Sequence, residues 1–126
     1  MEEKMGRVYH TVTSNNKSLN TLFDAGAIHN YITEKASQGF ATVSLRQPFD
    51  VALGGKGRKI SKASLIEGYI EGKHFYFWAN VIEDIGNDEK GREIDVIWGA
   101  VEMQRWNIRV DPKEEKLDLS GFRRIH

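Results

Sequence analysis

The sequence predicts a single all-β domain over residues 1–126, and three observations favour this fold class. Runs rich in β-branched and aromatic residues recur along the chain, and turn-forming residues separate them. Only two short segments, residues 33–39 and 100–106, carry the signals of a helix. A chain of 126 residues has room for one modest hydrophobic core, and no linker or internal repeat divides it.

The first third of the chain predicts a hairpin and a short helix. Residues 8–13 and 19–23 form two strands around a turn, and the second strand runs directly into Asp24. A helix follows between Thr33, which can cap its N-terminus, and Gly39, which can end it.

The middle of the chain predicts two hairpins and a loop. Phe49, Val51 and Leu53 alternate with polar or small residues, as in a half-buried strand. A glycine-rich turn interrupts this strand pattern at Gly54, Gly55, Lys56 and Gly57. Residues 65–82 predict a second, longer hairpin, and the polar residues 84–93 predict a surface loop.

The last third predicts a buried strand, a helix and a closing hairpin. Residues 94–98 are apolar except for one aspartate, which is typical of a strand buried on both faces, and Gly99 ends the run. The apolar residues that follow recur at helical spacing, and they are Ala100, Met103 and Trp106, with Val101 beside them. We expect this stripe to pack in the core rather than to form a binding groove. Residues 108–119 predict the final hairpin.

The composition disfavours several classes of function. Eighteen basic and eighteen acidic residues cancel, so nonspecific binding to nucleic acid lacks the basic surplus that it needs. The absence of cysteine removes disulfides and thiolate chemistry, and it suits a reducing compartment. The N-terminus has no apolar run typical of a signal peptide, and no stretch approaches the roughly 20 apolar residues of a membrane span. We therefore expect a cytoplasmic protein without nucleic-acid or membrane partners.

Three features follow one another in a meaningful order. Asp24-Ala25-Gly26-Ala27 comes after the apolar pair Leu22-Phe23, a glycine-rich hairpin tip comes next, and Ile97-Trp98-Gly99 precedes the C-terminal helix. In this order and spacing the chain resembles the retropepsin-like aspartic proteases, the family of the retroviral proteases with its retrotransposon and small prokaryotic relatives. The resemblance covers residues 8–119, and residues 27–32 look like the continuation found in retrotransposon members.

The resemblance implies a small closed β-barrel with one short C-terminal helix, which acts as a homodimer on a peptide or protein substrate. In such a protein Asp24 is catalytic, and the active-site loop is formed by Ala25, Gly26 and Ala27. The flap over the substrate is formed by Gly54, Gly55, Lys56 and Gly57. Two aspartates a few ångströms apart share one proton and supply both the base and the acid for hydrolysis, without a metal or cofactor. Because the chain has one such motif, the second Asp24 must come from a second subunit across a two-fold axis.

Two positions depart from the pattern of the family. Ala25 stands where the family has Thr or Ser, whose hydroxyl braces the two catalytic loops, and Ile28 replaces a small or polar residue. Neither change removes the carboxylate. Two functions therefore stay open: an aspartic endopeptidase, and a catalytically silent dimer that binds peptides or a partner protein in the same cleft. A small β-barrel binding module of the oligonucleotide-binding type is a third, which the balanced charge disfavours.

Simpler interpretations exist for the same residues. Asp24 and Gly26 are common turn formers at the end of a strand, and the glycine-rich tip has the composition of an ordinary hairpin turn. The four histidines lack metal-ligand spacing, so the sequence predicts no metal site. Phe75, Phe77 and Trp78 are expected to fill the core or the subunit contact. The agreement of several features in order, rather than any one of them, favours the protease interpretation.

Overall fold

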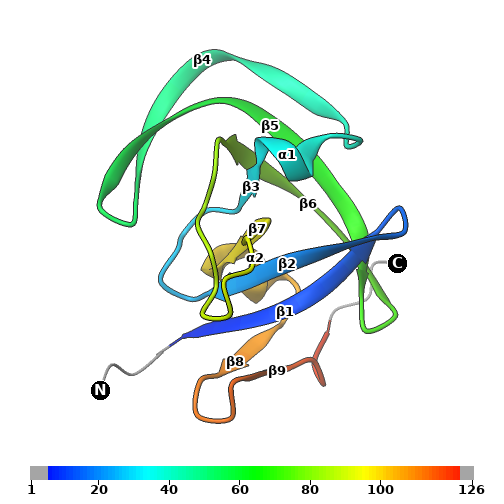
Figure 1. Cartoon of the computed structure of the whole chain (residues 1–126). Coiled ribbons are helices and arrows are strands. Elements are labelled where there is room, and N and C mark those ends of the chain that lie inside the picture. Colours follow the sequence, from blue (N-terminus) through cyan, green and yellow to red (C-terminus); the bar gives the residue numbers. More distant parts are fainter. Residues whose placement is uncertain (1–5, 123–126) are drawn as a thin grey trace.

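A computed structural model describes residues 6–122 of the chain, and most of this part is β-structure (Figure 1). The two helices are α1 (Glu34–Ser37) and α2 (Ala100–Arg105). The strands are β1 (Arg7–Ser14), β2 (Lys17–Asp24), β3 (Tyr31–Thr33), β4 (Thr42–Leu53), β5 (Lys56–Ile70), β6 (Lys73–Ile82), β7 (Val96–Gly99), β8 (Arg109–Asp111) and β9 (Lys116–Asp118). The all-β prediction is thereby confirmed for the described residues.

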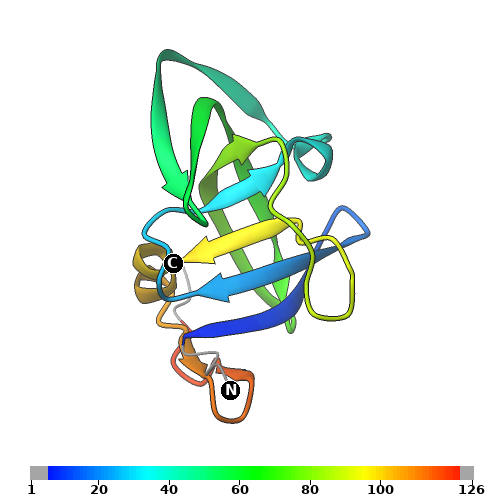
Figure 2. The same cartoon turned by 60° about the vertical axis from the view of Figure 1, so that its left-hand side comes forward.

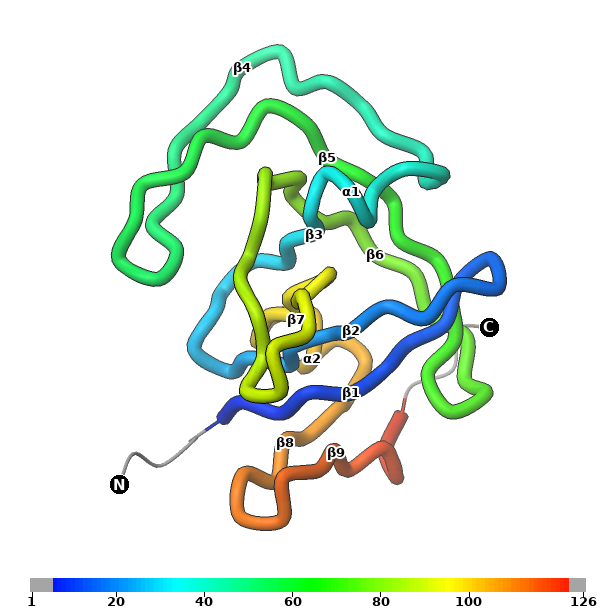
Figure 3. Tube along the Cα trace, viewed as in Figure 1, coloured from blue at the N-terminus to red at the C-terminus, as the bar shows by residue number. Residues whose placement is uncertain are grey.

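Seven strands form one sheet in the order β1-β2-β7-β3-β6-β5-β4, and β8 and β9 form a separate hairpin. β7 lies parallel to β2 and antiparallel to β3, so a strand from late in the sequence lies between two early strands in the middle of the sheet. The sheet curls until β1 meets β5 (Figure 3), where Thr13 pairs with Tyr69. Beyond this single pair, the closed barrel that the resemblance implies stays a prediction.

Tight two-residue turns set the register of the β1–β2 and β4–β5 hairpins. Asn15 and Asn16 join β1 to β2 with φ values of 49° and 63°. Gly54 and Gly55 join β4 to β5 in the same left-handed region, with φ values of 60° and 79°. Positive φ at both central residues is the type I′ geometry, whose twist matches that of the flanking strands. The β4–β5 turn is therefore Gly54-Gly55 alone, whereas Lys56 and Gly57, which the sequence placed in the tip, already belong to β5.

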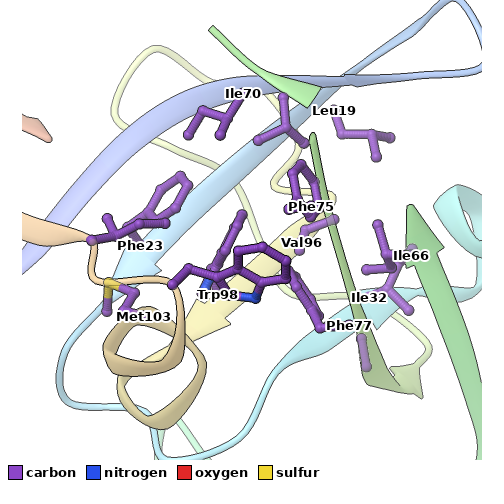
Figure 4. Packing of buried hydrophobic residues seen from close by; sticks show 14 of the residues in the cluster. Leu19, Phe23, Ile32, Ile66, Ile70, Phe75, Phe77, Val96, Trp98 and Met103 are labelled. Atoms are coloured by element: carbon purple, nitrogen blue, oxygen red, sulfur yellow. The ribbon is translucent and has the colours of Figure 1, made fainter. Parts of the chain in front are cut away.

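The larger core cluster surrounds the indole of Trp98. Trp98 is fully buried, and its ring lies 5.0 Å from Phe23, 4.7 Å from Phe75 and 4.6 Å from Phe77, measured between centroids. Figure 4 shows these rings gathered around Trp98, with Met103 of α2 close to Phe23. Ile97, the residue before Trp98, belongs to a second cluster on the opposite face of the sheet. β7 is therefore buried on both faces, as the sequence predicted.

Several sequence predictions need correction. Residues 31–33 form strand β3, which the sequence did not predict because three residues are too few for a periodic signal. The buried strand begins at Val96 rather than at residue 94. Trp78 and Val101 are 51% and 61% exposed, so neither side chain lies in the core of the single chain, whereas a subunit contact for Trp78 stays a prediction. Alternation along β6 and the helical turn of α2 point these two side chains away from the core that holds Met103 and Phe77.

The loop of residues 83–95, between β6 and β7, is fixed to β2 by Asn20. The Asn20 side-chain amide donates to Asp88 Oδ2 at 3.0 Å and to the Glu93 carbonyl at 2.9 Å. The backbone N–H of Asn20 donates to Asp95 Oδ2 at 2.8 Å. Asp88 is only 8% exposed, so the predicted surface loop has a buried polar anchor. Such an anchor keeps the loop in one conformation.

The two aspartates of this loop that accept hydrogen bonds from Asn20 predict opposite pH dependences of stability. Burial raises the pKa of Asp88, but hydrogen bonds from Arg92, Asn20 and Lys90 together lower it by more. The net pKa therefore lies below the ordinary value. A depressed folded-state pKa stabilises the protein above the unfolded pKa of about 3.9, and this contribution is lost as the pH falls through the folded value. Burial raises the pKa of Asp95, so its protonation favours the folded state as the pH falls.

We expect the free energy of unfolding of Asp88→Asn to fall less than that of the wild type between about pH 5 and pH 2, because the charge-dependent hydrogen bonds of Asp88 are removed at every pH. Asp95→Asn should steepen the same loss. Urea unfolding midpoints measured across this range check both expectations. Identical slopes for the wild type and the two variants would contradict the assignment of these carboxylates.

Candidate active site

Asp24 is the last residue of β2, and two neighbouring strands hold it in place. It pairs with Arg7 of β1 on one side and with Gly99 of β7 on the other. Alternation along β2 puts Asp24 on the same face of the sheet as Leu22, which belongs to the second core cluster. The Asp24 side chain is 20% exposed, so the carboxylate reaches solvent at the end of an interior strand.

Hydrogen bonds fix the loop that follows Asp24. Gly26 N–H donates to Asp24 Oδ1 at 2.8 Å, and Ala27 N–H donates to the Asp24 carbonyl at 3.1 Å. Ala25 N–H donates to the Gly6 carbonyl at 2.7 Å. The first bond is an Asx turn, in which an aspartate oriented by its own backbone tightens the chain. The carboxylate is therefore preorganised, with one oxygen held by Gly26.

The other oxygen of Asp24 faces a cation. Arg7 Nε lies 3.8 Å from Asp24 Oδ2, and the Arg7 side chain is 52% exposed. An ion pair this exposed contributes little to stability, but it orients the second carboxylate oxygen. The sequence interpretation missed Arg7, although counting residue pairs back from the Asn15-Asn16 turn matches Arg7 with Asp24.

Gly99 allows the active-site loop to pack against the start of α2. A side-chain carbon at this position would lie 2.5 Å from the His29 carbonyl oxygen and 2.8 Å from that of Ala27. No residue with a Cβ fits such an approach without moving the backbone. Ala100 N–H donates to the same Ala27 carbonyl at 2.7 Å, which ties the loop to the first residue of the helix. Figure 2 shows the loop passing beside α2.

Asn30 connects the far end of the loop to three elements. Its Oδ1 accepts from Gly99 N–H at 2.9 Å, and its amide donates to the Trp78 carbonyl at 3.1 Å and to Glu102 Oε1 at 3.4 Å. Asn30 is 9% exposed, and its own carbonyl accepts from Asn80 N–H at 3.0 Å. The sequence carried no signal for this residue, because a lone asparagine before an apolar pair is ordinary loop chemistry.

The β4–β5 hairpin extends over the same face of the sheet as Asp24. Val51 and Leu53 of this hairpin pack against the second core cluster, which contains Leu22 and Ile60. The tip lies on the same side of the molecule as the loop after β2 in both views (Figures 1 and 2). Cβ atoms placed on Gly54, Gly55 or Gly57 would meet nothing within 4 Å. The tip of the hairpin therefore lies near the site without packing against the rest of the described chain at these glycines.

The structure thus brings together Asp24, Ala25, Gly26 and Ala27 as one rigid loop, with Ala25 and Gly26 exposed. Gly54, Gly55, Lys56 and Gly57 lie apart from it on the projecting hairpin. The contacts of the Asp24 side chain within the described residues are to Gly26 and Arg7, neither of which is a carboxylate.

Two further findings concern other kinds of site. No group of three His, Cys, Asp or Glu side chains within residues 6–122 could hold a metal ion. His10 and His74 instead pair with Glu71 at 3.1 Å and with Glu67 at 2.7 Å. Over the same described part of the chain, no helix is long and apolar enough to span a membrane. His126 and most of the N-terminal stretch considered for a signal peptide lie outside the described residues.

No protein-family model matches the chain, and no curated protein sequence matches it. Several solved structures do match the chain. The retroviral protease-like domain of Ddi1 from Leishmania major superposes with a TM-score of 0.64 at 20% identity, covering 93% of this chain and 90% of that chain. The EIAV protease in complex with the inhibitor HBY-793 superposes with a TM-score of 0.55 at 17% identity, covering 88% of this chain and 98% of that chain. At these identities the likeness shows the fold alone, which is that of the retroviral proteases.

Proposed function

We propose that this protein is an aspartic endopeptidase that acts as a homodimer, with one Asp24 from each subunit in the active site. The observation that carries the proposal is the preorganised Asp24 carboxylate at the end of β2, in a chain with a retroviral protease-like fold. The protomer in this proposal closes into a barrel, the β4–β5 hairpin is the flap, and the protein works in the cytoplasm.

The chemistry follows from placing two such carboxylates together. Two aspartates a few ångströms apart do not both ionise readily, so they share one proton. The ionised partner takes a proton from the attacking water, and the protonated partner polarises the peptide carbonyl. Each Asp24 arrives already oriented by Gly26, so little reorganisation is needed when the dimer forms.

The exposed loop suits a symmetric contact. Ala25 and Gly26 are exposed in the single chain, directly beside the carboxylate, so a second copy has access to them. A two-fold axis at this loop would bring the two Asp24 side chains face to face. A peptide would then lie extended between the loops and the two hairpins, and its backbone would pair with the hairpin strands.

Ala25 supports a second candidate, a silent dimer that binds peptides in the same cleft. The methyl group of Ala25 offers no hydrogen bond across the two-fold axis, where a hydroxyl could brace the two loops. Ala25 is exposed in the single chain, so a hydroxyl on this side chain would be accessible to the partner subunit.

Assays at increasing protein concentration separate the two candidates. We expect cleavage of a diverse peptide library at mildly acidic pH, with a specific activity that rises with protein concentration as the dimer forms. Ala25→Ser and Ala25→Thr should raise the activity further by stabilising the dimer, and Ala41→Ser, at an exposed alanine outside the active-site loop, serves as the control. If none of these proteins cleaves while all of them bind peptides, the silent dimer is correct. A specific activity independent of concentration in a monomeric protein would refute the dyad.

A further inference from the structure

We propose that a pocket walled by Ile28, Trp78 and Val101 binds a large apolar side chain of the substrate peptide, about four residues from the cleaved bond. This inference rests on the proposed function, because it names a specificity site in the same cleft. The pocket has a volume of about 280 Å³, and the full set of lining residues is Ile28, His29, Asn30, Trp78, Asn80, Val101 and Glu102.

Three large apolar side chains are exposed together at this pocket. Ile28 is 65% exposed, Trp78 is 51% exposed and Val101 is 61% exposed. They come from the active-site loop, β6 and α2, so they are not neighbours in sequence. An apolar surface shared by three separate elements marks a binding site more often than scattered apolar residues do.

The walls of the pocket are held in place by Asn30. Its side chain bonds to the backbone at Gly99 and Trp78 and to Glu102 at the start of α2. Glu102 Oε2 also accepts from the indole N–H of Trp106 at 2.9 Å, so its carboxylate is engaged within the protein. The pocket is therefore preformed, with its main charged group already satisfied, which favours an apolar occupant over a charged one.

The sheet register places the pocket on the same face and at the same end as Asp24. Leu22 pairs with Ile97, Ile97 with Tyr31, and Tyr31 with Asn80, which makes a straight row across four strands. Three of these four side chains, those of Leu22, Ile97 and Tyr31, belong to the second core cluster. The row therefore runs along one face of the sheet.

Asp24 and Trp78 lie one step beyond this row. Asp24 lies two residues after Leu22 on β2, and Trp78 lies two residues before Asn80 on β6. β2 and β6 run in opposite directions, so both steps lead to the same end of the sheet. Three strand spacings of about 4.8 Å separate the two positions by about 14 Å. An extended peptide advances about 3.3 Å per residue, so about four residues reach from the dyad to the pocket.

The volume also fits one side chain. A pocket of about 280 Å³ is at the lower limit of sites that enclose small-molecule ligands, which begin near 300 Å³. A leucine or phenylalanine side chain entering between Trp78 and Val101 would cover apolar surface on both sides. Such a contact changes the specificity constant about tenfold or more per site.

The experiment uses a series of peptides that differ only at the residues three to five positions from the cleaved bond, with Leu, Phe, Ser or Asp at each. We expect the wild type to prefer Leu and Phe at one of these positions about tenfold in kcat/KM. Trp78→Ala should remove this preference, so that the Leu, Phe and Ser peptides are cleaved with similar kcat/KM. Tyr69→Ala is the matched control, because Tyr69 is an aromatic residue with the same 51% exposure that lies outside the pocket.

A second measurement separates this inference from the proposed function. Peptide affinity is measured with Asp24→Asn, alone and combined with Trp78→Ala or Tyr69→Ala, so that no cleavage is required. Loss of the Leu and Phe preference with Trp78→Ala alone supports the pocket even when the wild type cleaves nothing. Equal effects of Trp78→Ala and Tyr69→Ala, or no preference for apolar side chains, would overturn it. Weaker dimerisation of Trp78→Ala in sedimentation would overturn it too, by showing that a second copy covers this surface.

Discussion

Asp24→Asn should abolish peptide hydrolysis, with a loss of about 10³-fold or more, because the change removes both the base and the acid from the dyad. The asparagine side-chain oxygen can still accept the 2.8 Å bond from Gly26 N–H, so the loop should keep its conformation. Peptide binding should therefore persist while turnover is lost. A peptide cleavage assay together with a binding titration on the same preparation measures both.

The control is Asp111→Asn. Asp111 also accepts a backbone hydrogen bond, from Glu114 at 3.1 Å, but it lies in the β8–β9 hairpin, which is a separate sheet. This variant should hydrolyse peptides like the wild type. Full activity in Asp24→Asn, or an equal loss in Asp111→Asn, would contradict the role of Asp24.

Mixing the variant with the wild type tests whether the active site is shared between subunits. After equal amounts of the two chains exchange at random, about one quarter of the dimers carry two wild-type chains, so activity per wild-type chain falls to about half. A site contained in one chain would keep its full activity in the mixture. The result discriminates a shared dyad from any mechanism that uses a single carboxylate.

The features of the site that were predictable from sequence are local ones. The Asp24 loop follows from an apolar strand that ends in Asp and Gly, and the α1 cap follows from Thr33, whose hydroxyl accepts from Ala36 N–H at 3.1 Å. The two-residue turn at Gly54-Gly55 needs positive φ at both positions, which glycine adopts without strain. Each of these depends on residues adjacent in the chain, so a single sequence contains the information.

The features that were not predictable depend on how distant segments meet. Asn30 forms hydrogen bonds with Trp78, Gly99 and Glu102, which are 48 to 72 residues away. No local sequence pattern predicts such long-range contacts. The exposure of Trp78 depends on which face of β6 is covered, and alternation alone does not say which face that is. The projecting position of the hairpin tip likewise depends on the strands that pair beneath it.

Trp98→Ala should destabilise the protein by about 3–5 kcal/mol, the largest effect on stability that we expect from a single side chain. Trp98 is fully buried among Phe23, Phe75 and Phe77, and its removal leaves a cavity between them. Urea unfolding at a fixed protein concentration measures the effect. Trp78→Ala, at a tryptophan that is 51% exposed, should cost about 1 kcal/mol or less. Equal costs for the two substitutions would contradict the packing around β7.

Trp98→Phe refines the same test. The indole N–H of Trp98 is buried and has no acceptor among the described residues, so phenylalanine keeps an aromatic ring in the core and sacrifices no protein hydrogen bond. We expect Trp98→Phe to cost substantially less than Trp98→Ala. Because Trp98 pairs with Phe23 and Gly99 pairs with Asp24, the alanine variant should also loosen the strand that carries the carboxylate. Peptide hydrolysis by Trp98→Ala should therefore fall even at temperatures where the protein stays folded, whereas Trp98→Phe should retain most of it.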